Sequence, residues 1–200
     1  MKEQILIKST DLFLAYGFKS VTMDQIAQEM GISKKTIYTH FADKRELIKS
    51  CTFYLFETIC AGVENIICQE KNPIEEFFEI KTYVLRHLKD EKSSPQYQLQ
   101  KYYPKIYQTL ISKQLEYMQE SIIKTLQRGI EQQLFRKEMD VDFISRIYFV
   151  GMTGIKNSDL FPRASFEMNN LLNDYLEYHL RAIVTENGLI TLTNYLQKNA

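Results

Sequence analysis

The sequence predicts an all-α protein with a small N-terminal helix-turn-helix head and a larger helical-bundle body. Three observations lead to this prediction. The 200 residues include only 7 Gly and 4 Pro, too few for the many turns of a β-sandwich or barrel. Apolar residues recur at helical spacing along most of the chain. The length fits one domain, or one domain with a small appendage, at about 150 residues per domain.

The first fifty residues contain a dense series of helix start and stop signals. The first helix is expected to stop at Gly17, with Phe18 folding back on Phe13. The three later helix starts are preceded by the N-cap residues Thr22, Ser33 and Asp43. Gly31 is expected to end the short second helix. The predicted helices of the head are Lys2–Tyr16, Asp24–Met30 and Lys34–Phe41.

The last two of these helices, joined by a short turn containing Gly31, form a predicted helix-turn-helix. Ile37 and Phe41 are four residues apart and are expected to face the core. The exposed side then carries Lys34, Lys35, Thr36, Tyr38 and Thr39. Such a helix can enter the major groove of duplex DNA by its N-terminal end. The alternative is that the lysines are merely part of a solvated face.

The body is predicted to contain six further helices. Lys44, at the start of the first, is a ready phosphate site. Residues 89–94 are expected to form a loop, Asn187-Gly188 to end the last long helix, and residues 189–200 receive no assignment. The predicted division is a helix-turn-helix DNA-binding domain, 1–46, and a helical domain, 47–200. The predicted body helices are Lys44–Cys68, Pro73–Leu88, Gln96–Tyr102, Pro104–Leu134, 139–157 and Ser165–Thr185.

Composition and motifs disfavour several other classes of protein. The chain has 25 basic and 25 acidic residues, although residues 1–50 carry a net charge of +2. No apolar run approaches the roughly 18 residues of a membrane span, so a cytoplasmic protein without membrane contact is expected. Cys51, Cys60 and Cys68 are expected to be reduced thiols. The histidines lack metal-ligand spacing and no catalytic motif is found, so no metal, cofactor or enzymatic activity is predicted.

The head resembles the DNA-binding head of TetR-type transcriptional regulators. The matching residues are Thr22–Ala27, Gly31–Phe41, Lys44 and Leu47. The rest of the chain resembles the family mainly in helical pattern, length and order. The resemblance implies a homodimer that binds a double-stranded DNA operator and responds to an unidentified small-molecule effector.

The resemblance also implies roles for residues of the head. Thr22, Tyr38, His40 and Lys44 match positions that usually hold DNA phosphates; for His40, packing at the helix end is the alternative. Lys34, Lys35, Thr36 and Thr39 match positions that usually face bases or nearby backbone. Together with Ser33, these residues form the predicted DNA-binding site.

For the body, the resemblance implies an effector cavity and a dimer surface on the last two long helices. The expected cavity residues are Phe56, Tyr83, His87, Tyr103, Met118 and Phe149; core packing is the alternative for each. The expected dimer residues are Gly151, Gly154, Leu171 and Tyr178, with a monomeric bundle as the alternative. The predicted function is a repressor that a small apolar or aromatic effector releases from its operator. The alternative is a DNA-binding regulator without a small-molecule ligand, controlled by a protein partner.

Overall fold

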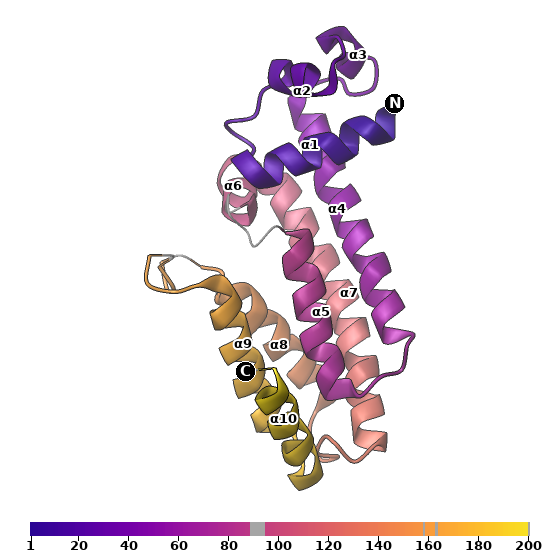
Figure 1. Ribbon diagram of the computed structural model, residues 1–200, viewed down its shortest axis with the longest axis vertical. Coiled ribbons are helices and arrows are strands. Elements are labelled where there is room, and N and C mark those ends of the chain that lie inside the picture. Colours follow the sequence, from indigo (N-terminus) through magenta and orange to yellow (C-terminus); the bar gives the residue numbers. More distant parts are fainter. Residues whose placement is uncertain (89–94, 158, 163, 200) are drawn as a thin grey trace. The chain divides into compact units, whose positions relative to one another are not determined.

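The computed structural model describes residues 1–88, 95–157, 159–162 and 164–199. Within these ranges the regular elements are α-helices, apart from one antiparallel bridge between Phe135 and Val184 (Figure 1). This confirms the predicted all-α fold with an N-terminal helix-turn-helix. The helices are α1 (Lys2–Tyr16), α2 (Met23–Met30), α3 (Lys34–Tyr38), α4 (Lys44–Ile67), α5 (Pro73–His87), α6 (Pro95–Tyr102), α7 (Pro104–Glu131), α8 (Val141–Gly154), α9 (Met168–Ile183) and α10 (Glu186–Lys198).

The chain divides into two compact units. Unit 1 contains residues 1–61 and 86–113, and unit 2 contains residues 62–85 and 114–200. Helices α4, α5 and α7 each contribute residues to both units. These three long helices continue through the boundaries between the units, and the predicted domains 1–46 and 47–200 stay a prediction.

Unit 1 has its own apolar core. Helices α1, α2 and α3 contribute buried side chains that include Phe13, Ile26 and Ile37, and α6 contributes Leu99. Phe18 folds back on Phe13 with ring centroids 5.2 Å apart, as the predicted stop of α1 requires. Helices α2 and α3, of eight and five residues, are thus held by a core that elements far along the chain complete.

Unit 2 contains two clusters of buried apolar residues. The larger one includes Phe77 of α5 and Tyr148 of α8, whose ring centroids are 5.4 Å apart. The smaller one joins Leu85 of α5 to Met168 and Leu172 of α9. Figure 1 shows α8 and α9 side by side in this unit, where the two helices are in contact.

Several helices end earlier than the sequence predicts. Helix α3 ends at Tyr38 rather than Phe41, because the N–H of His40 bonds the carbonyl of Ile37 and tightens the last turn. Helix α7 ends at Glu131 rather than Leu134, because Gln133 takes a left-handed conformation with φ 58°. Helix α8 likewise ends at Gly154, before the predicted residue 157. The predicted loop 89–94 lies outside the described residues.

The end of the chain differs most from the prediction. Asn187 and Gly188 were expected to end the last long helix, and this expectation is wrong. They lie in the first turn of α10, since the hydroxyl of Thr185 accepts a hydrogen bond from the N–H of Gly188 at 3.0 Å and caps that helix. Helix α9 ends two residues before Thr185.

Candidate nucleic-acid interface

The turn between α2 and α3 is defined by two side-chain caps and one glycine. Thr22 caps α2, because its hydroxyl accepts a hydrogen bond from the N–H of Gln25 at 3.1 Å. Gly31 ends α2 with φ 63°, a left-handed conformation that glycine adopts at little cost. Ser33 caps α3 by accepting from the N–H of Thr36 at 3.0 Å. The predicted caps of both helices are confirmed.

Helix α3 buries one side and exposes the other, as predicted. Ile37 is completely buried, and Phe41, just beyond the helix, is 2% exposed; both belong to the core of unit 1. The exposed residues are Lys34, Lys35, Tyr38 and Thr39. Helix α3 has only five residues and is a short ribbon in Figure 1, so these exposed residues lie together at one short helical tip.

The two lysines at the start of α3 have different surroundings. Nζ of Lys34 donates to Oδ2 of Asp24 in α2 at 2.8 Å, and this hydrogen bond raises the pKa of Lys34 above its usual value. Lys35 has no ion-pair partner among the residues that the structure describes. Lys34 is therefore held against α2, whereas Lys35 is the more available donor for a base or a phosphate.

The hydroxyl groups of α3 are largely engaged within the helix. The hydroxyls of Ser33 and Thr36 lie 2.8 Å apart, and Thr36 is half-buried rather than exposed. The hydroxyl of Thr39 donates to the carbonyl of Thr36 at 2.7 Å. With its hydroxyl engaged, Thr39 has its methyl group to offer to a base, such as the methyl of thymine.

The residues predicted to hold phosphates are spread over three helices. Thr22 is exposed at the start of α2, Tyr38 is 44% exposed, and His40 is half-buried after α3. Lys44 is the first residue of α4, and burial lowers its pKa. A phosphate beside this helix start would compensate the Lys44 ammonium, whereas the N–H of Glu46 in the same turn already donates to Oδ1 of Asp43 at 2.8 Å.

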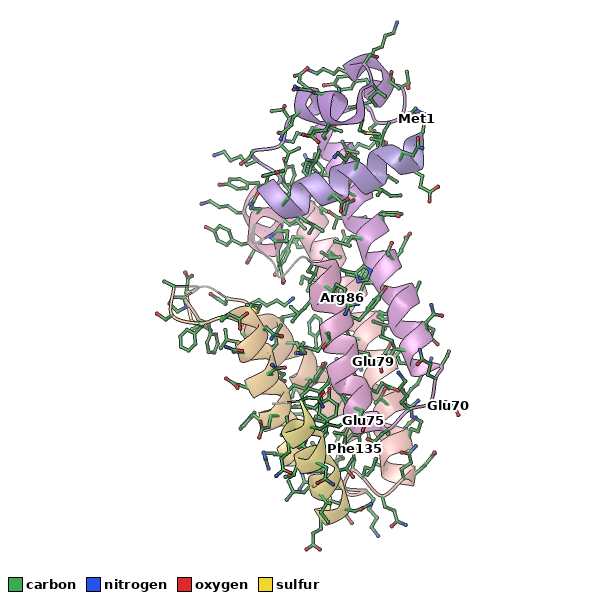
Figure 2. All side chains as sticks on the ribbon, viewed as in Figure 1. Met1, Glu70, Glu75, Glu79, Arg86 and Phe135 are labelled. Atoms are coloured by element: carbon green, nitrogen blue, oxygen red, sulfur yellow. The ribbon has the colours of Figure 1, made fainter. Side chains whose placement is uncertain are left out.

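Sequence reasoning missed two charged residues near α3. One is Asp24, the partner of Lys34. The other is Lys2, whose Nζ lies 5.7 Å from the centre of the Phe41 ring. Lys2 starts α1, beside the labelled Met1 in Figure 2. A further cation therefore lies near Phe41, just beyond the end of α3. No local pattern identifies Lys2, because 39 residues separate it from Phe41.

Three of the predicted cavity residues belong to unit 1. Phe56 and Tyr103 are partly buried and pack against the unit 1 core. Burial raises the pKa of the Tyr103 hydroxyl above its usual value. His87, at the end of α5, is half-buried. For Phe56 and Tyr103 these positions fit core packing.

The other three predicted cavity residues belong to unit 2. Met118 packs against the larger core cluster, and Phe149 is 8% exposed. The ring of Tyr83 lies where a β-carbon on Gly62 would be, so the glycine permits a close helix contact. These positions also fit core packing, and the effector cavity stays a prediction.

The predicted dimer residues divide into two kinds. Gly151 faces the ring of Tyr175, whose hydroxyl donates to the carbonyl of Ile147 at 3.0 Å, so this glycine permits close approach of α9 in the same chain. Leu171 is buried in the smaller core cluster of unit 2. Tyr178, in contrast, is 74% exposed, and the space beside Gly154 is open.

Three further observations concern metal ligands, cysteines and helix length in the part of the chain that the structure describes. No group of three His, Cys, Asp or Glu side chains is arranged there to hold a metal ion. None of the three cysteines forms a disulfide within the described residues. None of the described helices combines the length and the apolar character that crossing a membrane requires.

Comparison with known proteins identifies the relatives of this chain. The family described as "Bacterial regulatory proteins, tetR family" matches residues 5–51. The HTH-type transcriptional regulator YerO of Bacillus subtilis is 44% identical over 55 residues, which cover 27% of this chain and only 19% of YerO. The HTH-type transcriptional repressor KstR2 of Mycobacterium tuberculosis is 23% identical over 146 residues, covering 72% of this chain and 73% of KstR2.

A solved structure extends the similarity to nearly the whole chain. The TetR-family regulator from Agrobacterium tumefaciens covers 92% of this chain and 97% of its own, with a TM-score of 0.72 and 18% identity, and so shares the fold. These relatives are transcriptional regulators rather than enzymes. The family match thus covers the capped helix-turn-helix, within residues 5–51, and over the rest of the chain the likeness to the solved TetR-family structure is one of fold.

Proposed function

We propose that this protein is a homodimeric transcriptional repressor that binds an inverted-repeat operator and is released by a small apolar or aromatic effector. The observation that carries the proposal is the α3 tip, which exposes Lys35, Tyr38 and Thr39 while Ile37 is fully buried. A helix anchored in this way presents donors and a methyl group at a fixed spacing, as readout in a major groove requires.

Binding as a dimer is supported by an apolar stripe on α8. Phe143, Ile147 and Val150 follow the i, i+4, i+7 spacing of one helix face and are 57%, 41% and 60% exposed. Tyr178 of the neighbouring helix α9 is 74% exposed. Exposed apolar side chains along one helix face are typical of an interface, and a second copy would supply the second α3 for the other half-site.

DNA binding is tested by selecting duplexes from a random pool with the full chain. The expected product is an inverted repeat. Replacing Lys34 and Lys35 together by Ala should weaken binding and lower the slope of log K against log salt by up to about 2, since each lost phosphate contact removes about 0.9. The charge-matched control is Lys105→Ala with Lys113→Ala, both exposed in unit 1. Equal losses in the two variants would contradict docking through α3.

The effector distinguishes this proposal from control by a protein partner. KstR2 is described as a ketosteroid transcriptional regulator, which makes an apolar small molecule a reasonable class to test first. Native mass spectrometry of the purified dimer, followed by competition with the selected duplex, should reveal a small molecule that lowers DNA affinity. Such an effector must bind the two conformational states with different affinity. A dimer that no small apolar compound releases from DNA would favour control by a protein partner.

A further inference from the structure

A buried charge network ties three helices together inside unit 2. Glu76 of α5 is completely buried. Its Oε1 accepts a hydrogen bond from the hydroxyl of Thr125 at 2.8 Å, and its Oε2 accepts from Nη2 of Arg128, both on α7. A buried carboxylate is costly unless a cation and hydrogen bonds compensate it. Helices α5 and α7 alone therefore supply the cation and the hydrogen bonds that the buried Glu76 carboxylate needs.

Arg128 also makes a contact that Glu76 does not require. Its other terminal nitrogen, Nη1, donates to the carbonyl of Ile67 at 3.3 Å. Ile67 is the last residue of α4, and the same carbonyl accepts from the N–H of Glu70 at 3.0 Å, where φ of 49° turns the chain away from the helix. Figure 2 labels Glu70 in this turn. Arg128 thus holds the C-terminal carbonyl end of α4 with a charged donor.

Helix α4 makes this contact relevant to DNA binding. It is continuous from Lys44 to Ile67. Lys44 is a predicted phosphate contact and lies three residues after Phe41. A continuous helix transmits a displacement of one end to the other more faithfully than a loop does. Replacing a buried ion pair by apolar residues of similar volume is often neutral for stability. The planar guanidinium of Arg128, which reaches both Glu76 and Ile67, can therefore have a role besides stability.

We propose that Arg128 is a positioning residue: by holding the Ile67 carbonyl, it fixes the C-terminal end of α4 and so restricts the positions that the two heads of a dimer adopt. Restricting the heads lowers the entropy cost of engaging both half-sites at once, and has no effect on a single half-site. This inference rests on the proposed function, because it requires a dimer that binds an inverted repeat.

The test compares two duplexes for each variant: the inverted repeat selected by the wild-type chain, and the same duplex with one half replaced by unselected sequence. Glu76→Leu with Arg128→Met removes the contact to Ile67 without leaving a buried charge unpaired. Affinity for the inverted repeat should fall by roughly tenfold, within the usual range of coupling between sites. Affinity for the single half-site should change less than twofold, because α3 is untouched.

Two further variants separate positioning from stability. Thr125→Val removes the hydroxyl that bonds Glu76 and keeps Arg128 on Ile67, so it should lower the melting temperature and leave the ratio of the two affinities unchanged. Arg128→Lys keeps a cation beside Glu76 but loses the planar fork, so it should reproduce the loss seen with the double variant.

The outcomes are distinct. A folded double variant, or Arg128→Lys, that keeps the wild-type ratio of affinities overturns the inference. A change of ratio in Thr125→Val also overturns it, because general loosening of the core would then suffice. A wild-type chain that selects no inverted repeat overturns the proposed function, and this inference with it.

Discussion

At the scale of single residues, His179 is the clearest case of a polar group that the fold does not satisfy. It is 4% exposed, and its Nε2 has no hydrogen-bond partner in the described structure. The rings of Tyr148 and Tyr175 surround it at centroid distances of 5.3 and 5.8 Å. Burial lowers the pKa of His179 from 6.5 to about 4, because the apolar surroundings disfavour the imidazolium.

This burial predicts an acid-sensitive stability. Above pH 6.5 the imidazole is neutral in both the folded and the unfolded chain, so the shift has no effect there. As pH falls from 6.5 towards 4, the unfolded chain binds a proton that the folded chain does not, and the folded state loses stability by about 2 kcal/mol at pH 5. His179→Leu should remove this part of the pH dependence, as urea unfolding at pH 7.5 and 5.0 and one fixed protein concentration would measure.

The carboxylates also contribute to the pH dependence of stability, but their contribution is common to the wild type and the variant and cancels in the comparison. An equal loss of stability in the wild type and in His179→Leu between the two pH values would contradict the assignment. Because a buried unpaired nitrogen is itself unfavourable, the variant is also expected to be no less stable than the wild type at pH 7.5.

Single residues also show how far the candidate site could be predicted. The exposure of Lys34 and Lys35 follows from the helical period and the apolar positions of Ile37 and Phe41, which are local properties of the sequence. The ion pair of Lys34 with Asp24 joins two helices, and its geometry depends on how they cross. Tertiary contacts of this kind have no local signature.

At the scale of elements, helix starts were easier to predict than helix ends. A start has a chemical marker in the sequence, and the hydroxyls of Thr22 and Ser33 occupy their predicted places. An end without glycine has a weaker marker. Helix α7 ends where Gln133 takes a left-handed conformation. Two residues later, Phe135 forms a bridge with Val184, which lies about fifty residues further along the chain.

Helix α10 was missed for a related reason. Gly188 is a helix breaker by propensity, but here it is buried at the first turn of α10, where a β-carbon would overlap the carbonyl of Leu134. The ring of Tyr195 then stacks on Phe78 of α5 with centroids 4.6 Å apart. Packing against distant residues therefore overrides the local preference for a stop.

At the scale of the whole molecule, the repressor proposed here needs a second copy, and α8 offers the surface for it. The stripe of Phe143, Ile147 and Val150 is the side of α8 that the core leaves uncovered, whereas Tyr148 on the adjoining side is 3% exposed. The hydroxyl proton of Tyr175 is shared between two carbonyls of α8, at 3.0 and 3.2 Å, so α9 is joined to α8 within one chain and needs no partner for this contact.

Placing a carboxylate in this stripe should therefore separate the dimer. Val150→Asp would bury an unpaired charge in an apolar interface, and the dissociation constant of the dimer should rise by roughly 30-fold or more. Sedimentation equilibrium over a range of concentrations measures this directly. Ile190→Asp is a matched control, because Ile190 of α10 is 61% exposed and Val150 is 60% exposed. If both substitutions weaken the dimer equally, or neither does, the stripe on α8 is not the interface. If only Val150→Asp weakens the dimer, this variant should also lose affinity for the inverted repeat. Its affinity for a single half-site should stay unchanged.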